Sequence, residues 1–173
     1  MIHIRPEKPD DIESIDELTR LAFEGEDEAN LTAAIRASDY FIPALSLVAL
    51  DDTDQTVGHI LFSPITIESS ERSVEALALA PMAVLPEYQN RGIGSLLIQH
   101  GLAACKKLGY TIVVVVGHPE YYPRFGFKPA RDYGLEVPFE VPDEAFMVCE
   151  LVPGALKNVQ GVVKYSPAFD SVL

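Results

Sequence analysis

The chain has 173 residues, with 26 acidic against 13 basic side chains and a formal net charge of −13. Such a negative surface repels the phosphates of nucleic acids and anionic lipids, so we expect no nucleic acid and no membrane as a partner. Hydrophobic residues make up 48% and charged residues 23% of the chain, which is typical of one soluble globular domain, here spanning residues 1–173.

Targeting and metal-binding signals are lacking in this sequence. No apolar run approaches the roughly 18 residues that a membrane span needs, and residues 1–11 lack the apolar core of a secretory signal. Cys105 and Cys149 match no metal-site spacing, so we expect reduced, buried thiols. These features predict a cytoplasmic protein without a metal.

Hydrophobic periodicity predicts two helices and four strands in the first half of the chain. Pro64 indicates a bulge or a sheet edge, and Pro81 interrupts its strand because proline cannot donate to a β-ladder. We expect helices at about 10–22 and 27–37, and strands at 2–4, 45–50, 56–62 (continuing to 67) and 74–84.

The second half begins with a helix predicted at about 91–108, followed by a β-branched strand at 112–116. The strand before this helix, the helix itself and the strand after it form a βαβ unit with a right-handed crossover. A short helix containing Tyr121 and Tyr122 follows, and then further strands, one of them at 146–152. The pattern predicts one α/β fold.

A glycine-containing helix start follows the strand that ends at Val84. Gly92 and Gly94 let backbone N–H groups approach a ligand closely, and the first N–H groups of a helix favour a phosphate. Arg91 adds a positive charge. A dinucleotide-binding fingerprint would need a glycine where this chain has Leu97. A phosphate loop of the nucleoside-triphosphatase type would need Gly-Lys-Ser/Thr, which Gly94-Ser95-Leu96 does not supply. The segment therefore indicates a pyrophosphate cradle, the alternative being an ordinary helix start.

Two motifs identify a family. The pattern Val84-x-Pro86-x-x-Gln89-x-x-Gly92-x-Gly94 resembles the acyl-coenzyme A signature of the GNAT N-acetyltransferase superfamily. Downstream, Tyr122-Pro-Arg-Phe-Gly-Phe127 resembles that superfamily's Tyr-x-x-Leu/Phe-Gly-Phe motif. The closing stretches at 141–147 and 165–169 resemble a branch of predicted acetyltransferases called YhbS-like.

The resemblance implies a single GNAT-type domain of the α/β class: a mixed central sheet with a splayed parallel strand pair and flanking helices. It implies acetyl-coenzyme A as acyl donor, with the pantetheine arm paired to freed strand backbone at a bulge. The implied cofactor-binding residues are Met82, Ala83, Val84, Gln89, Asn90, Arg91, Gly92, Ile93, Gly94 and Ser95.

Tyr122 matches the superfamily tyrosine that often protonates the departing thiolate. A phenol with a reference pKa of about 10 stays protonated at neutral pH and is ready to donate. The alternative is that Tyr122 packs against the helix and only hydrogen-bonds the cofactor sulfur. Tyr121 would point elsewhere on a regular helix and is expected to pack or to form a substrate wall.

The general base is less defined by the sequence. Glu24, Glu26 and Glu28 lie where the superfamily's substrate-facing segments run, and Glu28 is our first choice as base or amine anchor. Acids at a helix start also serve the helix dipole, and a water chain can replace a dedicated base. His118 could act as a base, but we favour a loop-tying role for it; His59, within a strand, is expected to be structural.

We therefore expect an acetyl-coenzyme A-dependent N-acetyltransferase that acts by direct attack of a primary amine. The acceptor would be a small-molecule or peptide amine, and a cationic one is compatible with the net charge. A homodimer is compatible with the sequence. The alternative is a non-catalytic acyl-coenzyme A sensor that keeps the fold and the cleft.

Overall fold

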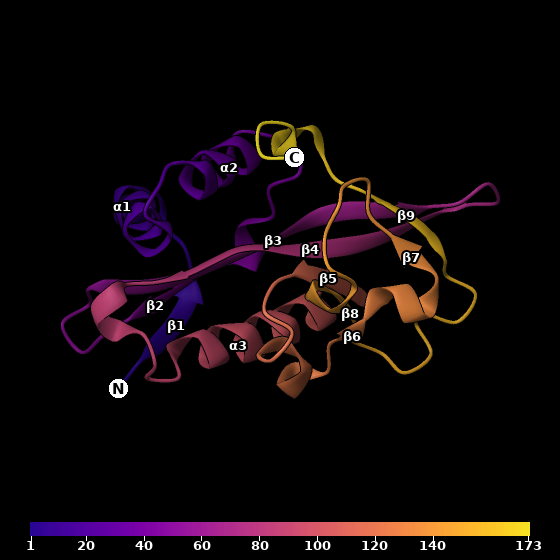
Figure 1. Cartoon of the computed structure of the whole chain (residues 1–173). Coiled ribbons are helices and arrows are strands. Elements are labelled where there is room, and N and C mark those ends of the chain that lie inside the picture. Colours follow the sequence, from indigo (N-terminus) through magenta and orange to yellow (C-terminus); the bar gives the residue numbers. More distant parts are fainter.

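The computed structural model describes all 173 residues, arranged around one nine-stranded sheet (Figure 1). The strand order is β1-β2-β3-β4-β5-β8-β6, and β9 pairs with both β3 and β7. The strands are β1 (His3–Pro6), β2 (Ser46–Leu50), β3 (Thr56–Glu68), β4 (Ser73–Val84), β5 (Ile112–Val116), β6 (Lys128–Pro129), β7 (Leu135–Glu136), β8 (Phe146–Glu150) and β9 (Gly161–Lys164). The α-helices are α1 (Ile12–Phe23), α2 (Asp27–Arg36) and α3 (Ile93–Lys107).

The helices lie on both faces of the sheet. Helix α3 covers one face, while α1, α2 and the C-terminal segment lie on the other (Figure 1). Two hydrophobic clusters fill the space between these layers, one with Leu97 and Ile98 of α3 and one with Leu31 and Ile35 of α2. No helix has both the length and the apolar character needed to cross a membrane.

The principal elements match the sequence-based expectations, and the differences have local causes. Helix α3 begins at Ile93 and not near residue 91, because Asn90 (φ 64°) and Gly92 (φ 82°) are left-handed. The expected tyrosine helix is a 3-10 turn, Tyr122–Phe125, with a proline at its start. Cys105 and Cys149 are free and buried, as expected.

Pro64 lies inside β3 and marks an edge without a bulge. Its Cα partner on β4 is Leu77, but the partners on the other side of β3 end at Leu61 and resume at Thr66. The missing N–H of proline therefore faces a stretch where β3 has no second neighbour, which costs no ladder hydrogen bond.

The parallel pair β4–β5 parts at the position that Pro81 predicts. Ile60 of β3 lies opposite Met82 and Phe62 lies opposite Leu79, so β4 carries an extra residue at Ala80–Pro81. Parallel pairing between β4 and β5 is limited to Leu77–Val113 and Ala78–Val114. Beyond these pairs the two strands diverge, and their facing backbone groups no longer meet.

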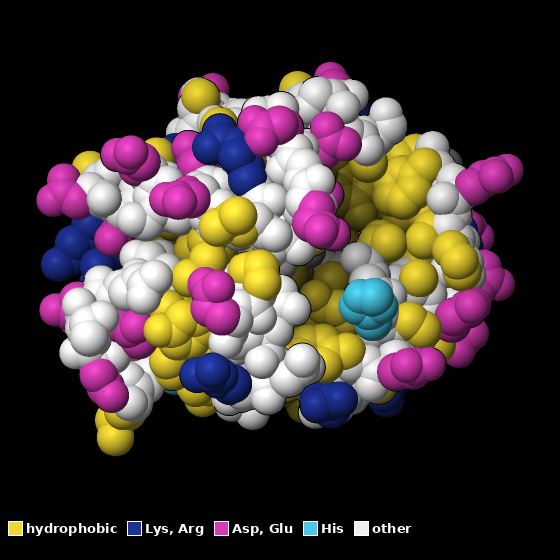
Figure 2. Space-filling view, turned by 60° about the vertical axis from the view of Figure 1, so that its left-hand side comes forward, with side chains coloured by type: hydrophobic (Ala, Val, Ile, Leu, Met, Phe, Trp, Pro, Cys, Tyr) yellow, Lys and Arg dark blue, Asp and Glu magenta, His cyan; other side chains and the backbone are white.

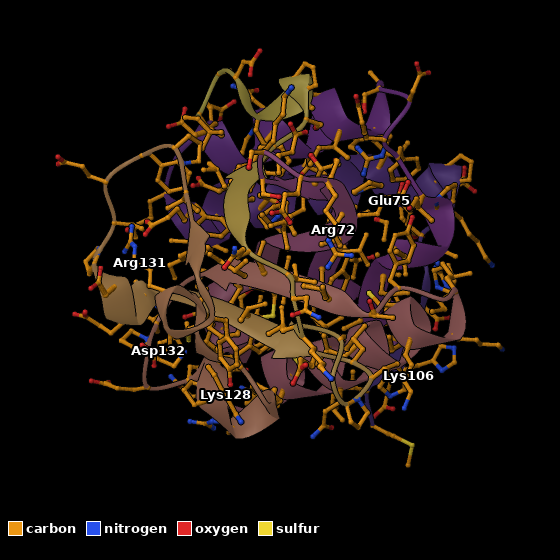
Figure 3. The ribbon with its side chains drawn as sticks, turned by 90° about the vertical axis from the view of Figure 1, so that its right-hand side faces the viewer. Arg72, Glu75, Lys106, Lys128, Arg131 and Asp132 are labelled. Carbon is orange, nitrogen blue, oxygen red and sulfur yellow. The ribbon has the colours of Figure 1, made fainter.

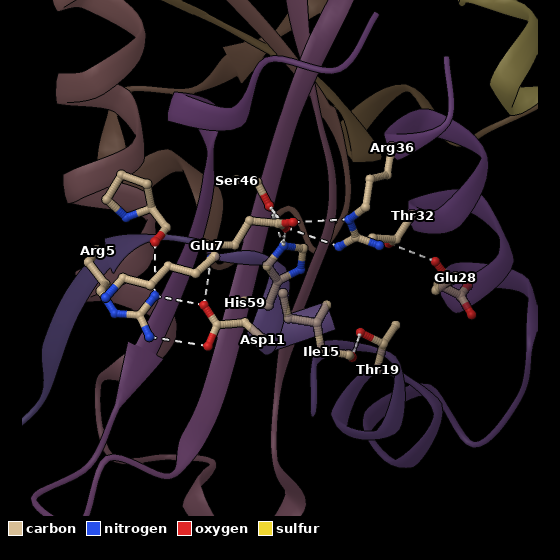
Figure 4. Close-up of polar contacts among 12 residues, drawn as sticks. Arg5, Glu7, Asp11, Ile15, Thr19, Glu28, Thr32, Arg36, Ser46 and His59 are labelled. Atoms are coloured by element: carbon tan, nitrogen blue, oxygen red, sulfur yellow. Dashed lines mark hydrogen bonds and ion pairs between the residues drawn. The ribbon is translucent and has the colours of Figure 1, made fainter. Parts of the chain in front are cut away.

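A buried polar network joins α2 to the first strands (Figure 4). Arg36 donates to both carboxylate oxygens of Glu7 at 3.0 Å. The Ser46 hydroxyl also bonds Glu7 and lies 2.8 Å from Nε2 of His59. That His59 nitrogen is 3.6 Å from the Glu7 carboxylate, and the histidine side chain is fully buried. His59 is thus structural, as expected from its place in a strand.

The network shifts two pKa values downward. Burial would raise the pKa of Glu7, but its contacts with His59, Arg36 and Ser46 outweigh burial and hold it at about 2. Burial lowers the pKa of His59 below its ordinary 6.5, against the opposing attraction of Glu7 and Asp16. His59 is therefore neutral and Glu7 ionised in the folded protein at neutral pH.

We expect the free energy of unfolding to fall as the pH drops from 7.5 to 5.5. The unfolded chain binds a proton at His59 near pH 6.5 and the folded one resists it, which gives at most about 1.4 kcal/mol per pH unit. Below pH 4.5 a second loss follows, because unfolded Glu7 binds a proton that folded Glu7, with a pKa of about 2, does not. Urea titrations at several pH values measure both.

The matched variant is His59→Gln, which should flatten the upper slope and reduce the lower one without abolishing it, because Arg36 and Ser46 still lower the pKa of Glu7. A wild-type unfolding free energy that stays level between pH 7.5 and 5.5 would contradict this account of His59.

Candidate active site

A cleft of about 1060 Å³ opens where β4 and β5 part. Its walls come from both faces of the sheet: Gly92 to Ser95 of the α3 side, and Glu28, Leu31 and Phe169 of the α2 side. Figure 2 shows the hollow, with hydrophobic side chains on its floor and walls and a histidine beside it. The separated strands thus connect the two faces of the sheet through one continuous cavity.

Unpaired backbone donors line the α3 end of the cleft. The N–H groups of residues 90 to 95 donate no hydrogen bond within the protein, whereas the N–H of Leu96 bonds the carbonyl of Gly92 at 3.1 Å. The left-handed residues Asn90 and Gly92 turn the chain so that this run of donors leads into the start of α3. Such a run is suited to an anion.

Gly94 lies where a side chain would intrude. A Cβ added there would lie 2.9 Å from the Tyr121 hydroxyl and 3.4 Å from the end of Met82. The Tyr121 hydroxyl is itself 3.2 Å from Oγ of Ser95. Tyr121 therefore lies over the start of α3 and lines the cleft, with Arg124 stacked on its ring at 4.8 Å.

Nine of the ten predicted cofactor residues line this cleft. They are Met82, Ala83, Val84, Gln89, Asn90, Gly92, Ile93, Gly94 and Ser95. Gln89 also closes the turn after β4, since its side-chain amide donates to the Val84 carbonyl at 3.0 Å.

Arg91 is the exception. It is exposed, its guanidinium stacks 5.1 Å from the Tyr88 ring centroid, and it lines a separate depression of about 320 Å³. Tyr88 in turn donates to Asp51 at 2.9 Å, which fixes the ring beneath the cation.

Tyr122 lies in the cleft wall and is 8% exposed. Its ring rests on Gly117, where a Cβ would come within 2.5 Å of it, and meets the Phe127 ring edge-on at 5.6 Å. Burial, with a smaller contribution from neighbouring Tyr121, raises the pKa of Tyr122 to about 12. The phenol is therefore a neutral proton donor throughout the physiological range.

Of the three candidate acids, only Glu28 lines the cleft. It is partly buried in the first turn of α2, and its carboxylate has no hydrogen-bond or ion-pair partner. Glu26 pairs with Arg20 at 2.9 Å, and Glu24 is exposed at the left-handed end of α1. The helix start that carries Glu28 therefore turns one acid inward and leaves the others in solvent.

His118 differs from the loop-tying role that the sequence favoured. Its carbonyl, and not its imidazole, holds the turn, by accepting from the N–H groups of Tyr121 at 3.1 Å and Tyr122 at 3.4 Å. The imidazole makes no hydrogen bond and lines the cleft. It is thus available, like Glu28, as a candidate base on the cleft.

The aromatic wall at the α2 end was not predicted from the sequence. Phe23, Phe139, Tyr165 and Phe169 line the cleft there. These residues come from distant parts of the chain and follow no motif, so only the fold brings them together. No three His, Cys, Asp or Glu side chains are grouped so that they could hold a metal ion.

Comparisons with known proteins agree on one family. The family described as "Acetyltransferase (GNAT) domain" matches residues 3–130. The uncharacterized N-acetyltransferase YhbS of Escherichia coli K12 is 35% identical over 167 residues, covering 96% of this chain and 98% of YhbS. The uncharacterized N-acetyltransferase YjhQ of the same organism is 41% identical over 135 residues, covering 78% of this chain and 74% of YjhQ.

Two solved structures have a closely similar fold. The crystal structure of Escherichia coli YhbS in complex with CoA has a TM-score of 0.90 and 34% identity, covering 98% of this chain and 92% of that one. A GNAT acetyltransferase of Brucella melitensis in complex with acetyl-CoA has a TM-score of 0.78 and 34% identity, covering 98% and 99%. With the family domain matched over most of its length and relatives this similar, the chain belongs to the GNAT family of N-acetyltransferases.

Proposed function

We propose that the protein transfers an acetyl group from acetyl-coenzyme A to a primary amine by direct attack on the thioester. The observation that carries this proposal is the cleft between β4 and β5, which has free N–H donors on the α3 side and Glu28 on the α2 side. Tyr122 lines the same cavity. A donor and an acceptor entering from opposite faces would therefore meet beside a phenol.

The chain's own groups fit the cofactor. The unpaired N–H groups of residues 90 to 95 suit a pyrophosphate, and Gly94 keeps the approach open. The β4 edge at Met82 to Val84, freed from β5, offers backbone partners to the amides of a pantetheine arm. The relatives from Escherichia coli and Brucella melitensis, solved with CoA and acetyl-CoA, support the same assignment.

Acetyl-coenzyme A supplies the thioester carbonyl carbon, to which the amine nitrogen bonds as the carbon–sulfur bond breaks. Glu28 would hold the amine and accept the proton that the nitrogen must lose, with His118 as the other basic group on the cleft. Tyr122 would donate its hydroxyl proton to the departing sulfur. Holding both reactants in one cavity contributes further by making the attack effectively unimolecular.

A cofactor sensor without activity is the competing function. The two are separated by measuring coenzyme A release from acetyl-coenzyme A across a panel of amines. Amine-dependent release supports the enzyme, whereas tight binding of acetyl-coenzyme A with no release for any amine supports the sensor.

Gly94→Val should weaken acetyl-coenzyme A binding at least tenfold, or about 1.4 kcal/mol. The added side chain would enter the space between α3, Met82 and the Tyr121 hydroxyl. Calorimetric titration measures the affinity, and circular dichroism checks the fold. Gly25→Val is the matched control, because Gly25 lies outside the cleft and a Cβ added there would have only one atom within 4 Å. An unchanged affinity of the Gly94→Val variant for acetyl-coenzyme A would contradict the proposed pyrophosphate site at the start of α3.

Tyr122→Phe should lower turnover by roughly two to four orders of magnitude, because it deletes the donor and keeps the ring that packs on Gly117 and Phe127. Steady-state turnover on any accepted amine gives the measurement. Tyr121→Phe, which loses the contact with Ser95, should act mainly on acetyl-coenzyme A affinity. An equal loss of turnover in both variants would contradict the assignment of the acid to Tyr122.

Glu28→Gln should raise the Michaelis constant for the amine, because the only acidic side chain on the cleft is neutralised. If Glu28 also accepts the proton, kcat falls as well, so the two constants separate an anchor from a base. Glu24→Gln is the matched control at an exposed position outside the cleft. Equal constants for the Glu28→Gln variant and the wild type would show that this carboxylate serves only the helix.

A further inference from the structure

The α2 end of the cleft has an apolar wall built from three separate segments. Helix α1 and helix α2 contribute one part, the loop between β7 and β8 a second, and the segment after β9 a third. The side chains concerned are Phe23, Leu31, Phe139, Tyr165, Phe169 and Val172. This surface lies across the sheet from the N–H donors of α3, at the end where an acceptor would enter.

Three of these side chains form an aromatic stack. The ring centroids of Phe139 and Tyr165 are 5.9 Å apart, and those of Tyr165 and Phe169 are 4.9 Å apart. Phe169 is buried and belongs to the same cluster as Leu31 of α2, so the stack is fixed to the helix that carries Glu28. Burial also raises the pKa of Tyr165 to about 12, which keeps this ring uncharged.

The loop that carries Phe139 is anchored by Arg131 (Figure 3). The guanidinium of Arg131 donates to the Val141 carbonyl at 3.1 Å, to Asp143 at 2.6 Å and to Glu136 at 3.1 Å. These contacts hold the loop on both sides of Phe139. The ring is thereby presented to the cleft by a constrained segment.

Charge is scarce on this wall. The chain has 26 acidic residues, yet Glu28 is the only acidic side chain that lines the cleft. The one basic side chain there with a permanent charge, Arg124, is stacked on Tyr121 at the α3 end. An acceptor at the α2 end would find a single side-chain carboxylate within an apolar surround, where a second charge would lose hydration without gaining a side-chain partner of opposite sign.

We propose that the acceptor is a primary amine whose only charge is its ammonium group and whose body is an aromatic ring a few bonds away. This proposal rests on the proposed function and names the substrate class of the same cleft. The ammonium would bind Glu28 and the ring would pack on the stack of Phe139, Tyr165 and Phe169. Diamines and amino acids, which bring a second charge, would be disfavoured.

The test compares amines that differ in charge and in apolar body. With 2-phenylethylamine, kcat/KM should be at least about 100-fold higher than with 1,4-diaminobutane or glycine, as expected when a buried apolar site meets a second charge. Phe-Gly-Gly amide, which carries the same ring beside a peptide N-terminus, separates a peptide source of this chemistry from a free amine. Equal or faster turnover of diaminobutane or glycine would overturn the proposal and leave the acetyltransferase function intact.

Variants of Phe139 test the wall itself. Phe139→Ala should lower the ratio of kcat/KM for 2-phenylethylamine to that for ethylamine by at least about tenfold, with Phe139→Leu between it and the wild type. Acetyl-coenzyme A affinity reports whether each variant keeps the fold. A ratio that Phe139→Ala leaves unchanged would contradict the ring-binding role.

A binding measurement keeps the inference testable if no amine is acetylated. Calorimetric titration of 2-phenylethylamine into the coenzyme A-saturated protein should then give binding that Phe139→Ala weakens, which supports the amine site while the transferase function fails. Absence of 2-phenylethylamine binding to the wild type would overturn the inference.

Discussion

At Ala80 and Pro81, strand β4 gains a residue relative to β3, just beyond Ala78, where its pairing with β5 ends. Proline cannot donate to a neighbouring strand, so a ladder at this point would be incomplete in any case. The divergence opens the sheet itself, so that under the proposed function two ligands would reach one another from opposite faces. This opening forms the cleft. Tyr122, the free N–H groups at α3 and the aromatic wall all line that cleft, so it is the opening that brings them to one cavity.

The α2 side of the opening is held by the buried polar network. Arg36, near the end of α2, is bonded to Glu7, while Glu28 is in the first turn of the same helix. Thr32 donates to the Glu28 carbonyl at 2.9 Å, within the helix between these two ends. Removing one partner of a buried ion pair typically costs about 3–5 kcal/mol. The network therefore links the stability of the first strands to the placement of the candidate acceptor-binding carboxylate.

The sequence predicted those parts of the site that depend on backbone and on neighbouring residues. The proline in β4 and the glycines at 92 and 94 act within a few residues of their own positions, so a local motif records them. Glu28 was the first choice from the sequence because a predicted helix carries it. That Glu28 lines the cleft and Glu24 and Glu26 do not depends on how α2 packs. Arg91 likewise follows the motif but stacks on Tyr88, a contact that no spacing specifies.

The aromatic wall was beyond local reasoning for a related reason. Phe23, Phe139 and Tyr165 are separated by long stretches of chain, and each alone is typical of an ordinary core residue. The net charge describes the surface more than the cleft, because exposed acids are screened within about 8 Å at physiological ionic strength. Fixed N–H groups at one end, and one carboxylate within an apolar wall at the other, act at shorter range. Under the proposed function, recognition in this cleft would therefore depend on the local groups that face the ligand more than on the overall charge of the protein.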